Sequence, residues 1–190
     1  MNPEELTRKW QHILDESAHI WSWTEPATLA YCCERAANAG NDAYAVELGT
    51  YLGKSAFCML RANPKLHLWC VDTFAVAGTQ HTAAYFLDKF IKEGRCELII
   101  GDSARAASML PHMKNKLDFV FADDGHAEED LKRDIRSFLP LMPRGSYLFG
   151  HDWEGDNDVA RGVKASLPVA KIQIVVPRVW QYQVQKCCGE

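Results

Sequence analysis

The stretch YAVELGTYLGKSAF, residues 44–57, decides the fold of this chain. A short apolar run ends around Glu47, Gly49 and Gly53 follow four residues apart, and Ser55 opens a second apolar segment. This order predicts a β-strand, a glycine-rich turn and a helix. Such a unit is typical of the beginning of a nucleotide-binding α/β fold.

The turn departs from Gly-x-Gly-x-x-Gly, the pattern of dinucleotide-binding folds. Glu47 stands in the place of the first glycine, and Gly53 comes one residue too late for the last. A carboxylate at the end of the strand disfavours a pyrophosphate and favours a cationic group. We therefore expect an adenosyl ligand whose amino-acid part carries an ammonium and a sulfonium. Gly49 and Gly53 would let the backbone approach it closely.

Composition and charge narrow the class of protein. The 190 residues, 47% of them apolar, can bury a sizeable core, so we expect one domain over 1–190. A net charge of −4 without a basic cluster gives no reason to expect a nucleic-acid partner. The start, MNPEELTRKW, is unlike a secretion signal, and no apolar run approaches the roughly 20 residues of a membrane span. We expect a cytoplasmic protein with no membrane partner.

The cysteines favour a reducing compartment. None forms a Cys-x-x-Cys pair, and most lie inside apolar runs. This pattern indicates small buried side chains rather than a zinc site or a disulfide framework. The seven positions are Cys32, Cys33, Cys58, Cys70, Cys96, Cys187 and Cys188.

Strand and helix patterns alternate after an N-terminal helical region over 1–40. In that region Thr24-Glu25-Pro26 predicts a helix start, with a cap, an acid and an early proline. Apolar runs predict strands over 44–48, 66–71, 96–100, 117–122, 146–150, 171–176 and 179–184. Helical patterns fall over 54–61, 82–92, 104–110, 128–139 and 158–166.

This alternation predicts an α/β fold of the Rossmann-like, doubly wound type. Nearly continuous apolar strands separated by helices form a mostly parallel sheet covered on both faces. The last two strands are too close for a helical crossover, so 171–184 should form a C-terminal antiparallel hairpin. We expect a seven-stranded sheet with N-terminal helices and a binding core over 44–165.

Each of the first five predicted strands ends in polar residues. In an open α/β sheet, ligands bind outside the carboxyl ends of the strands. Asp72 lies 25 residues after Glu47, where a carboxylate can accept both hydroxyls of an adenosine ribose. Asp102 and Ser103 can reach the adenine edge with a carboxylate and a backbone N–H. The five ends carry Glu47, Asp72, Asp102-Ser103, Asp123 to His126, and His151-Asp152.

The chain resembles class I S-adenosylmethionine-dependent O-methyltransferases, of the catechol O-methyltransferase type and of the macrocin O-methyltransferase and cephalosporin hydroxylase type. The motifs that carry the resemblance are ELGTYLGKSA, VDTF, IIGDSARAASML, and DFVFADDGH with LPLMPRGSYLFGHDW, over residues 44–165. It implies S-adenosyl-L-methionine as the cofactor. The cofactor-binding positions implied are Glu47, Gly49, Thr50, Gly53, Ser55, Asp72, Thr73, Asp102, Ser103 and Asp123.

The resemblance also implies a divalent metal held by Asp123, His151 and Asp152, which binds two oxygens of the substrate. Such a cation stabilises an acceptor oxyanion and orients it towards the methyl group. Carboxylates suit Mg²⁺, and a histidine ligand would shift the preference towards Mn²⁺ or Fe²⁺. His151 could instead orient Asp152 without touching the metal. His126, with Asp123, is the implied catalytic group, because histidine can take a hydroxyl proton near neutrality.

Two features leave alternatives open. The family's Asp-Gly-Asp-His appears here as Asp123-Asp124-Gly125-His126, with the middle pair exchanged, so the role of the family's second acid is in doubt. Trp21 and Trp23 precede the second N-terminal helix, and they form either a pocket wall or part of the packing of those helices.

The function that follows is metal-assisted O-methylation of a small hydroxylated molecule. One alternative is a metal-dependent oxygenase or hydroxylase on the same scaffold, since two histidines and carboxylates resemble an iron triad. Another is a non-catalytic S-adenosylmethionine-binding module. A chain of this length has little room for a cap over the acceptor, which is compatible with a small acceptor or with a homo-oligomer that completes the pocket.

Overall fold

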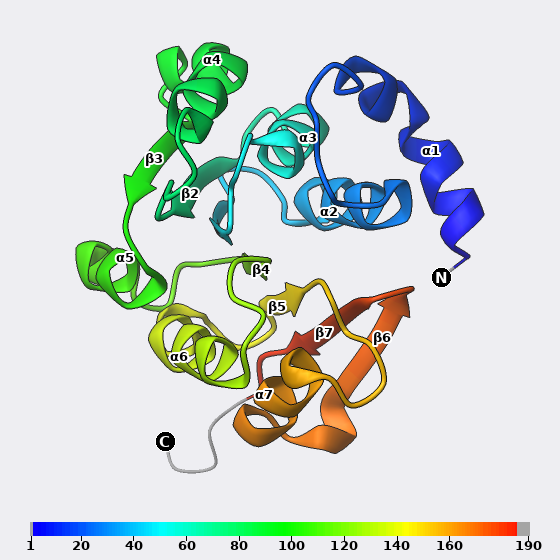
Figure 1. Ribbon diagram of the computed structural model, residues 1–190, viewed down its shortest axis with the longest axis vertical. Coiled ribbons are helices and arrows are strands. Elements are labelled where there is room, and N and C mark those ends of the chain that lie inside the picture. The colour runs from blue at the N-terminus through cyan, green and yellow to red at the C-terminus, as the bar shows by residue number, and fades with distance from the viewer. Residues whose placement is uncertain (1, 186–190) are drawn as a thin grey trace.

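A seven-stranded sheet forms the centre of the computed structural model, which describes residues 2–185 (Figure 1). The strand order is β3-β2-β1-β4-β5-β7-β6. Five strands are parallel, whereas β7 is antiparallel to both β5 and β6, as the sequence predicted. The strands are β1 (Tyr44–Leu48), β2 (His67–Asp72), β3 (Cys96–Ile100), β4 (Phe119–Ala122), β5 (Tyr147–Gly150), β6 (Ile172–Val176) and β7 (Val179–Gln183).

Helices cover both faces of this sheet and enclose two apolar cores. One core lies under α1 (Pro3–Glu16), α2 (Pro26–Asn38), α3 (Lys54–Ala62) and α4 (Thr79–Lys92). The other lies under α5 (Ser103–Met109), α6 (Glu128–Phe138) and α7 (Asp158–Ser166). Short 3₁₀ turns occupy Pro111–Met113, Leu139–Leu141 and Val169–Lys171. Within residues 2–185, no helix has the length and apolar character needed to cross a membrane.

The start of α2 differs from the sequence-based prediction by one residue. Glu25 holds the N-cap position, and its side chain makes no capping bond. Thr24, the predicted cap, accepts a 2.9 Å hydrogen bond from the hydroxyl of Ser22 instead. Pro26 stands at the first helical position, where its missing N–H costs nothing. The Glu25 carboxylate is therefore free to serve elsewhere.

The cysteines are buried as expected. Within residues 2–185 they are free thiols inside the cores. The sulfurs of Cys70 and Cys96, on neighbouring strands, are 3.7 Å apart. Cys187 and Cys188 lie outside the described residues.

Gly49 fixes how the loop after β1 meets the end of β4. Its φ of +88° lies in the left-handed region, as does the +86° of Gly53. A Cβ at Gly49 would lie 2.2 Å from the backbone oxygen of Asp123. The glycine is therefore required by packing between two strand ends, a reason that the sequence alone did not reveal.

Replacing Gly49 by alanine should destabilise the protein more than replacing Gly40. Gly40 has a similar φ of +89°, but its added Cβ would meet no described atom within 4 Å. We expect Gly40→Ala to cost about 1 kcal/mol of unfolding free energy from backbone strain, and Gly49→Ala at least about 3 kcal/mol, because overpacking adds to that strain. Urea unfolding measures both, and equal costs would contradict the packing role of Gly49.

Candidate active site

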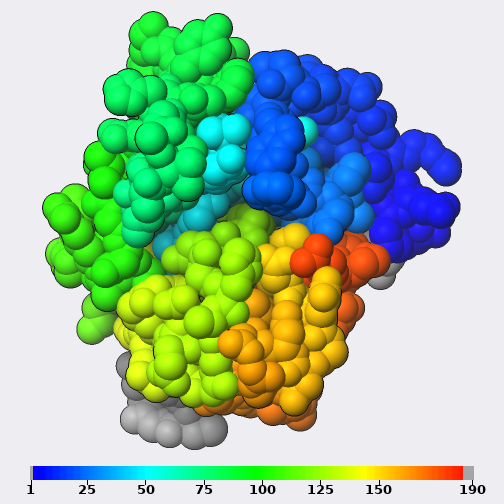
Figure 2. All heavy atoms as spheres, viewed as in Figure 1, coloured from blue at the N-terminus to red at the C-terminus, as the bar shows by residue number. Residues whose placement is uncertain are grey.

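Two adjoining cavities open at the carboxyl ends of the parallel strands. Their volumes are about 460 and 360 Å³. In the space-filling view, the blue segment before α2, the yellow-green segment after β4 and the red turn between β6 and β7 meet near the middle of this face (Figure 2). Both cavities are lined by Trp23, Gly49, Tyr51, Asp123 and His126.

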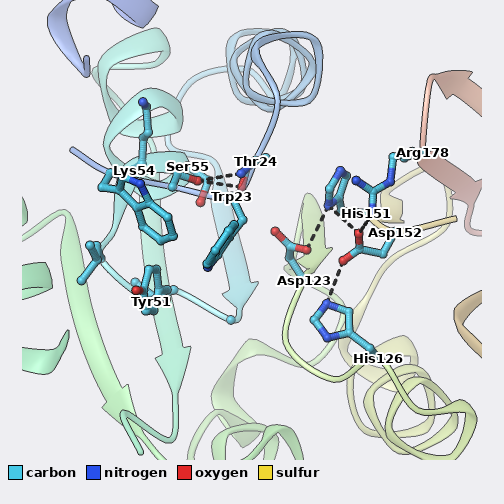
Figure 3. Close-up of a pocket in the computed structure, with 15 residues that line it drawn as sticks. Trp23, Thr24, Tyr51, Lys54, Ser55, Asp123, His126, His151, Asp152 and Arg178 are labelled. Carbon is cyan, nitrogen blue, oxygen red and sulfur yellow. Dashed lines mark hydrogen bonds and ion pairs between the residues drawn. The ribbon is translucent and has the colours of Figure 1, made fainter. Parts of the chain in front are cut away.

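Most of the predicted cofactor residues line one or both cavities. The larger cavity is bordered by Thr50 and Ser55 of the glycine loop and α3, and by His151 and Asp152 after β5 (Figure 3). The smaller one is bordered by Asp72, Thr73 and Asp102. Three predicted cofactor residues do not line either cavity: Glu47, Gly53 and Ser103.

Glu47 is a buried carboxylate with one of its two oxygens unpartnered. Its Oε1 accepts a 2.6 Å hydrogen bond from the hydroxyl of Ser55. Its Oε2 is buried and has no hydrogen-bond partner among residues 2–185. Burial raises the pKa of this carboxyl to about 7. An ionised Glu47 therefore calls for a cation, and a ligand ammonium fits this requirement.

Asp72 is held rigidly at the end of β2. Its Oδ2 accepts from the backbone N–H of Tyr51 at 2.7 Å, and its Oδ1 accepts from that of Phe74 at 2.6 Å. A carboxylate has about four acceptor sites, so both oxygens can still accept from a ligand. This arrangement fits the expected contact with a pair of ribose hydroxyls.

The two residues predicted to reach adenine point in different directions. Asp102 is exposed and lines the smaller cavity, where its side chain also caps α5 through the N–H of Arg105 at 2.8 Å. Ser103 is fully buried, and its hydroxyl accepts from Nε of Arg133 at 3.2 Å. Any contact of Ser103 with a ligand would therefore come from its backbone.

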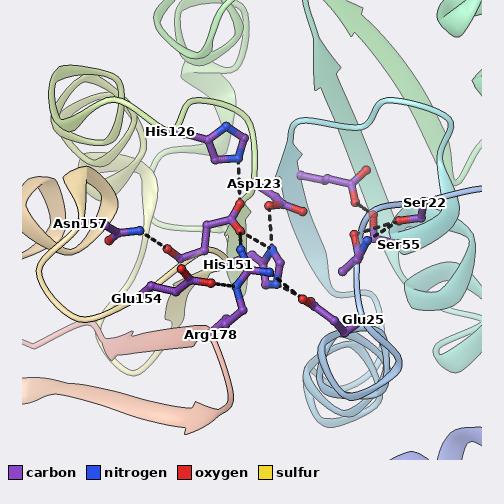
Figure 4. A network of polar contacts seen from close by, with 12 residues as sticks. Ser22, Glu25, Ser55, Asp123, His126, His151, Glu154, Asn157 and Arg178 are labelled. Atoms are coloured by element: carbon purple, nitrogen blue, oxygen red, sulfur yellow. Dashed lines mark hydrogen bonds and ion pairs between the residues drawn. The ribbon is translucent and has the colours of Figure 1, made fainter.

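His151 lies at the centre of an acidic cluster beside the larger cavity (Figure 4). Its Nε2 is 2.7 Å from Oε2 of Glu25, and its Nδ1 is 3.4 Å from Oδ1 of Asp123 and 3.3 Å from Oδ1 of Asp152. Carboxylates only accept, so the ring donates at both nitrogens as an imidazolium. Burial opposes this charge, but the hydrogen bonds with Asp123 and Asp152 outweigh it and raise the pKa of His151 to about 10.

Asp152 contacts two histidines and an arginine. Its Oδ2 is 2.7 Å from Nε2 of His126, and its Oδ1 faces both His151 and Nη2 of Arg178. The hydrogen bonds from the two histidines hold the pKa of Asp152 far below its usual range. Arg178, in the turn between β6 and β7, also contacts Glu25 through Nη1 at 2.7 Å and lies 2.7 Å from Glu154 through Nε.

Three side chains lie close enough together to hold a metal ion, and two of them, Asp123 and Asp152, are predicted ligands. Ligand atoms of Asp123, His126 and Asp152 lie within 4.8 Å of one another. His151, the predicted ligand, has both ring nitrogens directed at carboxylates instead. His126, the predicted catalytic group, is therefore also a candidate ligand, and a metal-binding role of His151 stays a prediction.

The charges of the cluster suit a divalent cation. The carboxylates of Glu25, Asp123, Asp152 and Glu154 surround the guanidinium of Arg178 and the imidazolium of His151. Two negative charges are left without a partner when all four acids are ionised. Burial also raises the pKa of Asp123, and a nearby cation would favour its ionised form. Carboxylate and imidazole ligands fit Mg²⁺ or Mn²⁺ by charge and ligand type.

Sequence reasoning missed two residues of the cluster, Glu25 and Arg178. In the sequence, Glu25 is explained as part of a helix start, and Arg178 lies between the two strands of the predicted hairpin. The tryptophans, for which two roles were open, line the larger cavity. Trp21 and Trp23 meet edge to face with ring centres 4.3 Å apart, and their side chains are 49% and 78% exposed, so they form a wall and are not core packing.

Asp124, the acid of the exchanged pair, borders the smaller cavity and lies near a buried acid of α6. Asp124 interacts with the buried Asp134 of α6, and burial together with the charge of Asp124 raises the pKa of Asp134 well above its usual range. A proton shared by the two carboxyls would supply the donor that both carboxylates lack. At Gly125, a Cβ would lie 2.3 Å from Cβ of Asp130, so a larger residue does not fit there.

Fold and site together define a class I methyltransferase. The strand order, the glycine loop after β1 and the acidic ends of β1, β2 and β4 are those expected from the resemblance. Residues 46–153, more than half of the chain, match the family model of the methyltransferase domain, and the chain belongs to this family. It is an S-adenosylmethionine-dependent methyltransferase, as the sequence analysis expected. No curated protein matches.

Solved structures of low sequence identity share the fold. A protein from Staphylococcus aureus that is assigned as a caffeoyl-CoA O-methyltransferase is 15% identical to this chain, with a TM-score of 0.68. The match covers 95% of this chain and 97% of that one. An O-methyltransferase from Bacillus cereus in complex with S-adenosylhomocysteine is 14% identical, with a TM-score of 0.64 and coverage of 93% and 91%. The TDP-rhamnose 3′-O-methyltransferase of calicheamicin biosynthesis is 16% identical, with a TM-score of 0.66 and coverage of 100% and 96%.

Replacing Asp134 by asparagine should change how stability depends on pH. Because the pKa of Asp134 is raised on folding, the folded protein keeps a proton that the unfolded chain has lost. Its stability therefore falls as pH rises above the ordinary aspartate range. Asp134→Asn removes this loss, so its Tm should match that of the wild type near pH 4 and exceed it increasingly towards pH 9. Parallel Tm curves in a calorimetric pH series would contradict the shared proton.

Proposed function

We propose that this methyltransferase transfers the methyl group of S-adenosylmethionine to a hydroxyl of a small molecule, assisted by a divalent cation at Asp123, His126 and Asp152. One observation carries the proposal: Gly49 and Asp123 line both cavities. A cofactor held across the glycine loop would therefore meet an acceptor beside the metal-ligating group. The proposal includes the cofactor contacts expected from the sequence.

Glu47 and Asp72 would bind the two ends of the cofactor. The unpartnered Oε2 of Glu47 fits the ammonium of the amino acid, with Ser55 orienting the carboxylate. Asp72, fixed by two backbone N–H groups, would accept the ribose hydroxyls, and Asp102 would accept from the adenine amino group. Thr50, Gly53, Thr73 and Ser103 would complete the set.

The larger cavity would receive the acceptor. Its volume of about 460 Å³ is in the range of small-molecule pockets, and its aromatic wall suits a ring. The similar proteins from Staphylococcus aureus and from calicheamicin biosynthesis are named O-methyltransferases, which supports O-methylation here.

The protein's own residues would position the cation and move the proton. A bound dication lowers the pKa of an acceptor hydroxyl and holds the resulting oxyanion. Asp123 and Asp152 would hold that cation, with the imidazole of His126 as a third ligand. His126 could instead stay off the cation and act as the base, because a ring bound to the cation has no lone pair left for a proton. Its 2.7 Å contact with Asp152 favours this arrangement. With Nε2–H donated to that carboxylate, Nδ1 can accept the proton of the hydroxyl.

The ligand set favours methyl transfer over an oxygenase. The gathered group has one imidazole and two carboxylates, whereas the iron facial triad has two imidazoles and one carboxylate. The large cavity beside the acids argues against a module that only binds the cofactor. The single domain over 1–190, the cytoplasmic location, the absence of nucleic-acid and membrane partners, and a homo-oligomeric state stay predictions.

The affinity of the protein for S-adenosylhomocysteine, the product formed from the cofactor, should depend on pH through Glu47. The pKa of Glu47 is about 7 in the free protein, and only its ionised form attracts an ammonium. Affinity for S-adenosylhomocysteine should therefore fall about tenfold per pH unit below 7. Glu47→Gln should bind more weakly at pH 8 and lose this dependence. Calorimetric titration tests this, with 5′-methylthioadenosine, which lacks the ammonium, as the control. A wild-type affinity that is constant from pH 5.5 to 8 would refute the role of Glu47.

Two single variants should separate cofactor binding from methyl transfer. Asp72→Ala removes the ribose acceptors and should abolish binding of S-adenosylhomocysteine. Asp152→Ala leaves the smaller cavity intact, so binding should stay within about twofold while transfer of a labelled methyl group to catechols and sugar nucleotides is lost. If Asp152→Ala retained wild-type turnover with any acceptor, the assignment of the cation site would be wrong.

A further inference from the structure

Glu25 joins three separate parts of the fold at the edge of the active site. It stands at the start of α2, and its two carboxylate oxygens face different cations. Oε2 is 2.7 Å from Nε2 of His151, after β5, and Oε1 is 2.7 Å from Nη1 of Arg178, in the β6–β7 turn. These contacts span 126 and 153 residues of sequence.

The two cations that Glu25 contacts share one oxygen of Asp152, and His151 also reaches Asp123. Nδ1 of His151 faces Oδ1 of Asp123 and Oδ1 of Asp152, and Nη2 of Arg178 also contacts Oδ1 of Asp152. Oδ2 of Asp152 is left for His126 (Figure 3). Glu25 thus determines, through His151 and Arg178, which carboxylate oxygens are engaged and which face the cavity.

Glu25 also sets the charge of the cluster. With its carboxylate present, one side of each cation is neutralised by Glu25 rather than by Asp123 or Asp152. Without it, His151 would direct its full charge at Asp123 and Asp152, and Arg178 would be shared by Asp152 and Glu154 alone. The cations would then compete with a dication for the same oxygens, and the cluster would lose one of its two excess negative charges.

We propose that Glu25 is a positioning residue for a divalent cation. By binding His151 and Arg178, it would orient the carboxylates of Asp123 and Asp152 that hold the cation. The inference rests on the cation site of the proposed function. Residues that orient metal ligands from outside commonly change metal affinity about 10- to 100-fold when they are lost. Glu25 requires no contact with the cation, the cofactor or the acceptor to have such an effect.

Titration of the full-length chain with Mn²⁺ tests this role, with binding followed by electron paramagnetic resonance and calorimetry. Glu25→Gln keeps the size of the side chain and removes its charge. We expect its Mn²⁺ affinity to fall about tenfold or more, while the affinity for S-adenosylhomocysteine stays within about twofold. Glu4→Gln is the matched control, since Glu4 is an exposed acid that lines the same outer groove as Glu25. It should change neither affinity.

A double-mutant cycle distinguishes positioning from a general structural effect. If Glu25 acts largely through His151, Glu25→Gln should weaken Mn²⁺ binding much less in a His151→Asn background than in the wild type. Equal Mn²⁺ affinities of Glu25→Gln and the wild type would overturn the inference and leave the cation site intact. A parallel loss of Mn²⁺ and S-adenosylhomocysteine affinity would overturn it as well. Failure of the wild type to bind Mn²⁺ would instead refute the cation site itself, and this inference with it.

Discussion

The close approach of Gly49 to the backbone of Asp123 is the constraint on which the active site depends. The strand order reverses between β1 and β4, because β1 pairs with β2 on one side and with β4 on the other. Open α/β sheets bind ligands at such a reversal. A glycine without a Cβ brings the loop after β1 against the end of β4, and the same two residues line both cavities. The cofactor side and the acceptor side therefore share one wall.

Charge organises the acceptor side of that wall. Several acids at one point would repel each other, but a buried imidazolium and a guanidinium lie between them. His151 and Arg178 thereby hold the carboxylates in fixed directions, and a remaining excess of negative charge is available for a dication. On the cofactor side, Glu47 has no cationic partner within residues 2–185. Each side thus lacks a positive charge that a ligand can supply.

Local sequence patterns predicted the fold well, and most of the residues expected to bind the cofactor line the two cavities. The strand over 44–48 and the helix over 158–166 agree with the structure to the residue, because glycines and capping residues mark their ends. The cluster around His151 could not be predicted in the same way. Glu25 is 126 residues away in sequence, and an acid before Pro26 has an adequate explanation as a helix start. Which of the two histidines, His126 or His151, can face a cation depends on which ring nitrogens contact carboxylates, and sequence spacing carries no information on that.

Calorimetric titration of the wild-type chain with S-adenosylhomocysteine at pH 8 tests the central claim most directly. At this pH Glu47 is largely ionised, and Asp72 is already fixed by backbone hydrogen bonds. We predict saturable binding with one ligand per chain in the micromolar range. Absence of binding up to millimolar ligand would contradict the account, because the two cavities would then not form the binding site of one cofactor and its acceptor.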